Sequence, residues 1–189
     1  QTLEIFMANP LYVSHSHSDA RPARKGRLAT LAGIAVILAA CASPADIPPG
    51  TSLTDMEARY GAPTIDCPLP DGTRHVVWSG QPMGQFAWAT TVTPDGRVGQ
   101  IEQLLTDRAF ATVKVGEWNA DRLLCMFGPP AEKSEVGLPS NLQHIWSYRY
   151  RQSGAWNSLM HFYIGPDGRI TRMHPGPDPM FEPVEWDFR

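Results

Sequence analysis

The segment Pro166-Asp167-Gly168-Arg169-Ile170 decides how this chain folds, because it repeats the earlier segment Pro94-Asp95-Gly96-Arg97-Val98. Proline fixes φ and glycine accepts a positive φ, so each segment predicts a tight turn between two antiparallel strands. The second strand of each hairpin is expected to start at Val98 or at Ile170.

Two further landmarks recur in the same order along the chain. Trp78-Ser79 returns as Trp146-Ser147, and Tyr60-Gly61-Ala62-Pro63 returns as Phe127-Gly128-Pro129-Pro130. Ordered matches at a similar offset are typical of a duplicated unit. The sequence therefore predicts two copies of one module, residues 51–107 and 114–174.

The same order of one helix followed by strands is predicted in each copy. A helix over 54–60 is expected to be capped by Thr54 with Glu57 and to end at Gly61; in the second copy Asp121 takes the capping role and Gly128 ends the helix. Strands are expected over 75–79 and 85–93, and over 144–150 and 158–165. The predicted fold class is α+β: two tandem modules, each a short helical segment followed by a three-stranded antiparallel meander.

The strands of the second module predict a surface for protein contacts. Alternation places Trp146, Tyr148 and Tyr150 on one face of their strand and Ser147 and Arg149 on the other. In the next strand Met160, Phe162 and Ile164 oppose His161 and Tyr163. The mixed polar and aromatic face is typical of interfaces, so Arg149, His161 and Tyr163 are candidate partner-binding residues. Trp156, in a loop between these strands, is the candidate exposed anchor.

Charge excludes two classes of function. The chain has 16 basic and 19 acidic residues, and residues 41–189 alone carry a net charge of −5. Nucleic acids and anionic membrane surfaces are bound through clustered Lys and Arg, which this part of the chain lacks. We therefore expect no nucleic-acid partner and contact with a membrane only through an anchor.

The first 40 residues predict a secretory signal. A basic stretch over 21–27 precedes the apolar run 28–40, which is too short to span a bilayer. Leu38-Ala39-Ala40-Cys41 resembles the bacterial lipobox, which implies lipid attachment at Cys41. Ala42, in place of a retention aspartate, implies the outer membrane, facing the periplasm. Residues 41–50 would then form a Pro-rich, extended tether.

The order of a short capped helix, Phe127-Gly128-Pro129-Pro130, Trp146-Ser147-Tyr148 and the stretch 159–168 resembles the SmpA/OmlA (BamE-like) domain of outer-membrane lipoproteins. The tandem form is similar in architecture to beta-lactamase inhibitory protein, whose modules join their sheets. The resemblance implies a non-enzymatic scaffold that binds envelope proteins, among them barrel-assembly components, without a cofactor.

Two alternatives to that function stay open. The joined sheet face could inhibit a periplasmic enzyme, such as a beta-lactamase or a wall hydrolase. A third and weaker interpretation is a protein that binds a small ligand, which would require an enclosed pocket.

No pattern of catalytic or metal-binding residues emerges. His75, His144, His161 and His174 lack the spacing of a zinc site, so each is expected to make an ordinary hydrogen bond. Asp95 and Asp167 fall in the repeated turns, where aspartate serves the backbone. We expect no enzyme, no metal and no cofactor.

Two cysteines remain once Cys41 carries a lipid. In an oxidising periplasm Cys67 and Cys125 can form a disulfide that ties the modules together, whereas the apolar side of its helix would equally suit Cys125 as a buried free thiol. The tail 175–189 is rich in proline, which argues against a helix or a central strand; it either packs on the modules or binds a partner.

Overall fold

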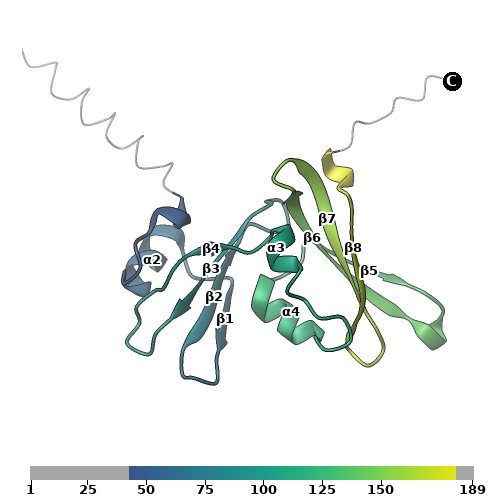
Figure 1. The fold of residues 1–189 in the computed structure, drawn as a ribbon, viewed down its shortest axis with the longest axis horizontal. Helices are drawn as coiled ribbons and strands as arrows, with labels where there is room; N and C mark the ends of the chain where they lie inside the picture. Colours follow the sequence, from purple (N-terminus) through teal and green to yellow (C-terminus); the bar gives the residue numbers. More distant parts are fainter. Residues whose placement is uncertain (1–42, 182–189) are drawn as a thin grey trace, which may run out of the picture. The chain divides into compact units, whose positions relative to one another are not determined.

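The computed structural model describes residues 43–181, which form two four-stranded antiparallel sheets and a few short helices (Figure 1). Sheet 1 has the order β1-β2-β3-β4 and sheet 2 the order β5-β6-β7-β8. η2 (Pro44–Asp46) precedes module 1, which contains α2 (Leu53–Tyr60), β1 (Ile65–Pro68), β2 (Arg74–Ser79), β3 (Ala87–Val92) and β4 (Glu102–Gln103). The helices α3 (Asp107–Phe110) and α4 (Ala120–Phe127) follow, and then β5 (Glu132–Val136), η3 (Pro139–Asn141), β6 (Gln143–Gln152), β7 (Trp156–Ile164), β8 (Ile170–Pro177) and η4 (Pro179–Phe181).

The predicted α+β class is confirmed, but the three-stranded meander is wrong, since each sheet has four strands. The missed strands, β1 and β5, precede the predicted ones and lie at the sheet edges. β5 is exposed along its whole length, and β1 is short and ends in proline. β5 therefore shows no apolar alternation, and in β1 the alternation extends over only four residues, which is too short to identify a strand.

The duplicated turn explains how each module is built. In module 1 the residue before the helix, Ser52, forms a β-bridge with Arg97, and in module 2 Asn119 forms the same bridge with Arg169. The turn arginines donate to the carbonyls of Gly50 (3.3 Å) and Gly116 (3.2 Å). Each Pro-Asp-Gly-Arg turn thus docks against the start of its own module's helix, about 50 residues earlier in sequence.

These bridges also correct the predicted helix starts. The first helix is capped by the Ser52 side chain, which accepts from the Asp55 N–H at 3.1 Å, not by Thr54. The second is capped by Asn119, which accepts from the Arg122 N–H at 2.9 Å, not by Asp121. Because the turn pairs with the residue just before each helix, the helix begins earlier than local sequence suggests. The predicted ends at Gly61 and Gly128, both with φ of 81°, are confirmed.

The strand after the first turn also differs from expectation. Val98 forms only an isolated bridge with Val92, and β4 begins at Glu102. In module 2 the expected start at Ile170 is confirmed, and β8 continues to Pro177. Its prolines are tolerated because β8 is an edge strand of sheet 2.

Two apolar cores define the layers of this compact unit. The smaller core joins α2 to one face of sheet 1, where Met56 packs with Val76 and Trp78. The larger core contains Val77 and Ala89 from the other face of sheet 1 together with α3, α4 and sheet 2. α4 therefore lies between the two sheets (Figure 1).

The short helix α3, which the sequence analysis missed, places Phe110 at the centre of the larger core. Its ring lies 5.0 to 6.3 Å from the rings of four aromatic residues and is completely buried. Those residues are Phe127, Tyr148, Tyr150 and Phe162. Full burial of a phenylalanine side chain stabilises the fold by about 1.5–3 kcal/mol, so this contact is a main connection between the modules.

Candidate interaction surface

Three of the four predicted partner-binding residues share one face of sheet 2, which we call the outer face because it points away from the larger core. β6 and β7 pair with Ser147 opposite His161. Arg149 and Tyr163 each lie two residues further along their strands, so they point to the same side. The fourth residue, Trp156, lies at the β6–β7 hairpin and is 70% exposed, as predicted for a surface anchor.

The prediction that Arg149 contacts a partner is wrong, because its side chain is buried and only 2% of the residue is exposed. Its guanidinium donates to both carboxylate oxygens of Asp178, to Glu132 Oε1 at 2.8 Å and to the carbonyl of Pro82. The hydrogen bond to Asp178 raises the pKa of Arg149, while its burial acts in the opposite direction. Arg149 is therefore a structural cation that ties β6 to the β2–β3 loop and to the segment after β8.

The β2–β3 loop completes the edge of β6 where β5 no longer reaches. Gln81 accepts from the Arg149 N–H at 3.2 Å and donates to the Arg149 carbonyl at 2.8 Å. A side-chain amide thus occupies the place that a neighbouring strand's backbone would take. Through the Pro82 carbonyl, which accepts from the Arg149 guanidinium, the same loop also covers Arg149 on the outer face of sheet 2.

The remaining part of the outer face is open. It presents four side chains that we call the His/Tyr patch: His161, Tyr163, Arg172 and His174. The His174 ring centroid lies 5.4 Å from that of His161 and 5.4 Å from that of Tyr163. The Tyr163 hydroxyl is 3.1 Å from His174 Nε2, and the Arg172 guanidinium stacks 3.9 Å from the centre of the Tyr163 ring. His174 and Arg172 are exposed, and His161 and Tyr163 are half-buried.

The electrostatics of the patch favour a neutral His161. Burial lowers its pKa, the nearby His174 lowers it further, and Glu132 has a smaller opposing effect. His161 Nδ1 is 2.8 Å from the Ser147 hydroxyl, and a Cβ at Gly176 would come within 3.0 Å of its Nε2. The hydrogen bond to Ser147 therefore fixes the His161 ring on the sheet, and the lack of a side chain at Gly176 leaves the space that the ring occupies.

This arrangement has the residue composition of a recognition surface. Arginine, tyrosine and histidine in mutual contact offer a cation, π faces and hydrogen-bonding groups, which is the composition enriched in interface hot spots. Among residues 43–181 there is no cluster of three His, Cys, Asp or Glu side chains placed to hold a metal ion. The expected ordinary hydrogen bonds are present for all four histidines: His75 contacts the Met126 carbonyl at 3.3 Å, and His144 pairs with Glu135 at 3.1 Å.

Two hollows that could hold a ligand lie away from the patch. One, of about 640 Å³, lies between the β4 region and helices α3 and α4, with Glu102 and Arg108 in its wall. Another, of about 690 Å³, is lined by Phe86, Arg108 and Arg151 where the β2–β3 loop meets the β6–β7 hairpin. Neither includes a residue of the His/Tyr patch.

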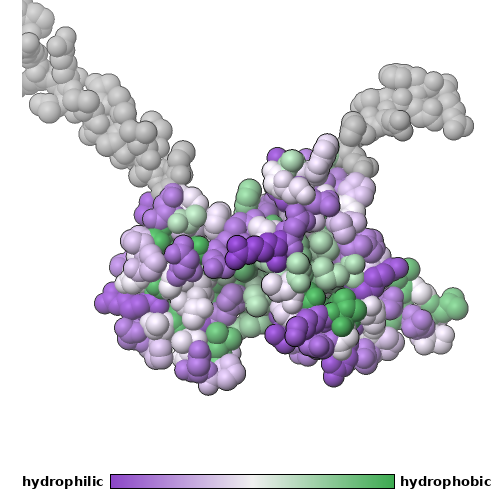
Figure 2. All heavy atoms as spheres, viewed as in Figure 1, coloured by the Kyte–Doolittle hydropathy of each residue, from purple (hydrophilic) through white to green (hydrophobic). Residues whose placement is uncertain are grey.

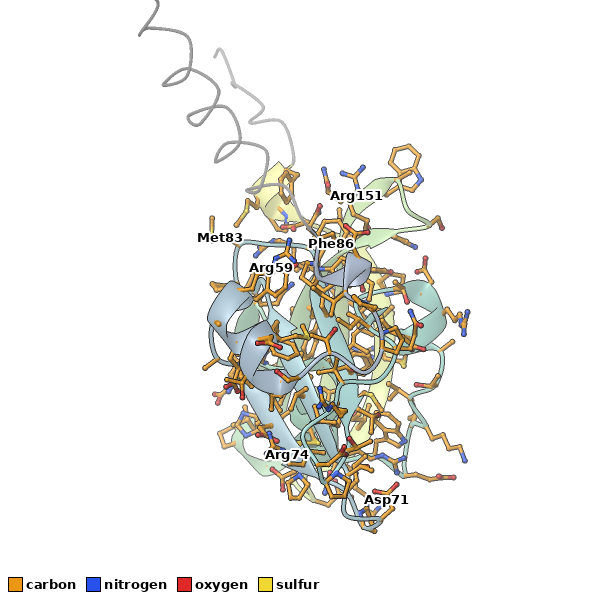
Figure 3. All side chains as sticks on the ribbon, turned by 90° about the vertical axis from the view of Figure 1, so that its left-hand side faces the viewer. Arg59, Asp71, Arg74, Met83, Phe86 and Arg151 are labelled. Atoms are coloured by element: carbon orange, nitrogen blue, oxygen red, sulfur yellow. A yellow bond between two sulfur atoms is a disulfide. The ribbon has the colours of Figure 1, made fainter. Side chains whose placement is uncertain are left out.

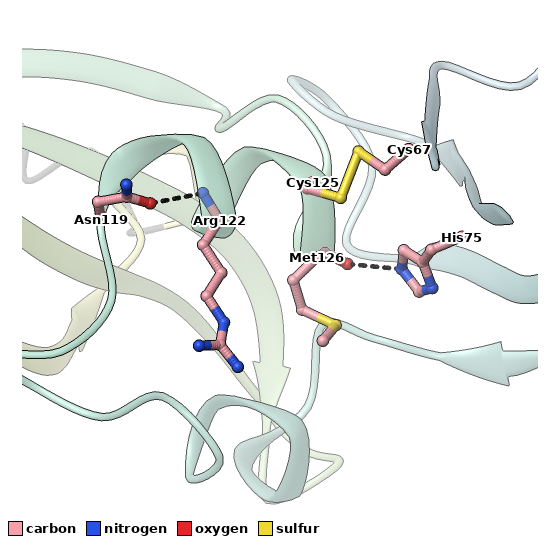
Figure 4. Close-up of a disulfide and its surroundings, with 6 residues drawn as sticks. All are labelled: Cys67, His75, Asn119, Arg122, Cys125 and Met126. Carbon is pink, nitrogen blue, oxygen red and sulfur yellow. Dashed lines mark hydrogen bonds between the residues drawn. A yellow bond between two sulfur atoms is a disulfide. The ribbon is translucent and has the colours of Figure 1, made fainter. Parts of the chain in front are cut away.

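A disulfide joins Cys67 and Cys125, the pairing that the sequence left open (Figure 4). Their Cα atoms are 5.9 Å apart, and the bond links β1 of module 1 to α4 of module 2. The contact of His75 with the Met126 carbonyl lies next to it and reinforces the same junction. The modules are thus connected covalently as well as through the larger core.

The predicted lipid-attachment residue Cys41 lies outside the described residues, but the segment that follows it does not extend freely as expected. Residues 44–46 form η2, capped by the Ser43 side chain. The Ser43 carbonyl accepts from the Tyr60 hydroxyl at 3.2 Å, and Ile47 packs against the smaller core. Over residues 43–181, none of the helices is long and apolar enough to cross a membrane.

Comparison with known proteins yields one similar solved structure. No model of a known protein family matches the chain, and neither does any curated protein sequence. A DUF4309 family protein (YjgB) from Bacillus subtilis subsp. subtilis str. 168 is 19% identical, with a TM-score of 0.27 over 68% of this chain and 79% of that one. The resemblance to the BamE-like domain therefore stays a prediction from sequence motifs.

Proposed function

We propose that this protein is a lipid-anchored protein of the bacterial envelope that binds a partner protein through the outer face of sheet 2. The observation that carries the proposal is the His/Tyr patch, a connected set of aromatic and cationic side chains on a sheet face with no helix over it among the described residues. Sheet 1 offers no comparable surface, since α2 covers one face and α4 packs on the other.

The proposed compartment is the periplasmic side of the outer membrane. The lipobox-like Leu38-Ala39-Ala40-Cys41 supports it, as does the Cys67–Cys125 disulfide, because such bonds persist in oxidising compartments. Together they favour a secreted and anchored protein over a cytosolic one.

The proposed role is non-enzymatic. The Ser147 hydroxyl is 2.8 Å from His161 Nδ1, the spacing of a nucleophile and its base, but Ser147 is only 3% exposed and so is not accessible to a substrate. In the BamE-like interpretation the partner is an envelope protein such as a component of the barrel-assembly machinery. In the alternative, the patch caps a periplasmic enzyme and inhibits it.

Crosslinking in the native envelope tests this function. A photoreactive phenylalanine in place of Tyr163 is expected to give a defined adduct, whereas the same residue in place of Asp71, an exposed turn residue of module 1, gives none. Because Arg172 stacks on the Tyr163 ring, Arg172→Ala is expected to weaken the adduct.

The outcomes separate the alternatives. A barrel-assembly component in the adduct supports the scaffold, and a beta-lactamase or wall hydrolase whose activity falls on binding supports the inhibitor. No adduct at position 163, or equal adducts at positions 163 and 71, would overturn the proposal that this face binds a partner.

A further inference from the structure

The first described residues sit firmly on module 1. Ser43 accepts from Tyr60, Ile47 packs on the smaller core, and the Gly50 N–H donates to the Val98 carbonyl at 2.7 Å. Only Ala42 separates Ser43 from Cys41, and consecutive Cα atoms are about 3.8 Å apart. A lipid on Cys41 would therefore place the bilayer surface within about 8 Å of Ser43, which is too close for the domain to hang free of it.

The end of the molecule near this attachment point carries most of the exposed apolar side chains. Of the eight large hydrophobic residues exposed in the described part of the chain, five come from the β2–β3 loop, the β6–β7 hairpin and η4. We call them the apolar end: Met83, Phe86, Trp156, Met180 and Phe181. Their exposures range from 44% to 70%.

Contacts between these three segments hold the apolar end together. Gln85 Nε2 donates to Asn157 Oδ1 at 2.9 Å, and the Asp178 N–H donates to the Asn157 carbonyl at 3.3 Å. Arg149 adds its bonds to Pro82 and Asp178. These hydrogen bonds thus connect the three segments that carry the five apolar residues.

The attachment point belongs to the same end. The Trp78 indole at the end of β2 donates to the carbonyl of Gly61, which closes α2, so the end of α2 lies beside the β2–β3 loop. Tyr60, which holds Ser43, is the last residue of α2. In the view of Figure 3 the neighbouring Arg59 lies toward the same end of the molecule as Met83 and Phe86, with Asp71 and Arg74 at the opposite end.

Three exposed arginines flank the apolar end. Arg59 and Arg151 lie there in Figure 3, and Arg108 lines the same hollow as Phe86 and Arg151. Two exposed acids lie near them: Asp46 in η2, and Asp107, which accepts from the Ser153 N–H at 2.6 Å and from the Tyr150 hydroxyl at 3.0 Å. The turns at the opposite end carry both charges, with Asp71, Asp95 and Asp167 matched by Arg74, Arg97 and Arg169.

We infer that the apolar end rests on the surface of the lipid bilayer, with Met83, Phe86 and Trp156 in the headgroup region beside the anchor. Aromatic and apolar side chains flanked by arginines are favoured in that region, and burial of apolar area adds to the affinity given by the acyl chains. This inference rests on the proposed lipidation of Cys41. On the face seen in Figure 2 both hydrophobic and hydrophilic residues are present at this end, and other hydrophobic residues gather lower in the right-hand half of the molecule.

Contact of the apolar end with the bilayer would fix the orientation of sheet 2 relative to the membrane. The strands of sheet 2 run away from the apolar end (Figure 1), so they would stand roughly along the bilayer normal. The His/Tyr patch would then lie clear of the lipid and face sideways, accessible to a membrane-bound neighbour.

A depth measurement on the lipidated protein tests the inference. With Cys67 and Cys125 bonded and Cys41 acylated, one added cysteine is the single free thiol of the chain. Met83→Cys, Trp156→Cys and the control Leu138→Cys, which replaces a residue 72% exposed away from this end, are each labelled with an environment-sensitive fluorophore. The proteins are reconstituted in vesicles of phosphatidylethanolamine and phosphatidylglycerol that contain a headgroup quencher.

We expect the labels at positions 83 and 156 to lose most of their fluorescence and to shift to the blue, and the label at 138 to keep the values it has in buffer. Equal, weak quenching at all three sites would overturn the inference.

Two controls separate this result from failure of the proposed function. Mass spectrometry of the mature protein shows directly whether Cys41 is acylated, and Cys41→Ala should release the protein from membranes. A protein that is acylated and membrane-bound but unquenched at positions 83 and 156 refutes only the seating. A protein without the lipid refutes the anchor on which both proposals stand.

Discussion

Replacing Asp178 by asparagine tests the buried ion pair that joins the chain's last described segment to β6. Asp178→Asn keeps the shape of the side chain but removes the charge that faces Arg149, and the two side chains are 0% and 3% exposed. Removal of one partner from a buried pair costs about 3–5 kcal/mol, because the remaining charge stays desolvated without compensation.

The structure places the expected cost at the lower limit of that range. Arg149 would keep its contacts with Glu132, whose side chain is 50% exposed, and with the Pro82 carbonyl. We therefore expect Asp178→Asn to lower the free energy of unfolding by about 3 kcal/mol, which for a chain of this size corresponds to a fall in Tm of about 6–12 °C.

Equilibrium unfolding in urea, with the disulfide kept oxidised, measures this change. The matched control is Asp66→Asn, which breaks an aspartate–arginine pair with Arg74 at 2.7 Å whose side chains are 40% and 43% exposed. Exposed pairs contribute about 0–1 kcal/mol, so the control should change little. A loss below about 1 kcal/mol for Asp178→Asn at an unchanged m-value would refute the conclusion that Arg149 is a structural cation.

Three further predictions concern the junction, the patch and the tryptophans. The pair Cys67→Ser and Cys125→Ser, separated by 58 residues, should cost about 4 kcal/mol of unfolding free energy by loop entropy, measured by the same urea titration. The pKa of His161 is lowered in the fold, so the unfolded chain takes up its proton first; stability should fall as the pH drops below about 6.5, and His161→Gln should reduce that slope, as followed by thermal unfolding across pH. Trp156→Ala should change stability by less than about 0.5 kcal/mol, whereas Trp78→Ala, 8% exposed, should cost about 3–5 kcal/mol; comparable losses for both would contradict the assigned burial.

The sequence was informative wherever a local signal matched the tertiary structure. The second duplicated turn predicted the start of β8, and the alternation in 144–164 predicted which side chains of β6 and β7 share a face. Trp156 was recognised as exposed because its loop lacks apolar neighbours. Gly61 and Gly128 marked the helix ends, since a positive φ is a local requirement.

The errors came from contacts between residues far apart in sequence. Arg149 has the position of a solvent-facing strand residue, and only its proximity to Asp178 and to the β2–β3 loop makes it a buried cation. β5 is exposed throughout, so its sequence has no alternation of apolar residues. It is a strand because it pairs with β6. The helix starts were displaced because each is set by a turn about 50 residues later. The role of Gln81 was also missed. Its side-chain amide bonds to the Arg149 backbone as a neighbouring strand would, and no residue pattern predicts that contact.

The two copies of the module are alike in their internal contacts but differ in what their sheets face, and this difference determines which sheet face is left uncovered. Each Pro-Asp-Gly-Arg turn docks on its own helix in the same way, so α2 and α4 occupy equivalent places. α2, however, packs on sheet 1 alone, whereas α4 packs on both sheets and carries Cys125 of the disulfide. Stacking the modules through α4 covers the second face of sheet 1 and leaves the outer face of sheet 2 as the one on which exposed aromatic and cationic groups gather. A single joined concave sheet, as in the tandem architecture predicted from sequence, would have distributed binding residues over both modules. In the proposed function, the copy nearer Cys41 therefore positions the other, and the second copy would present the binding face.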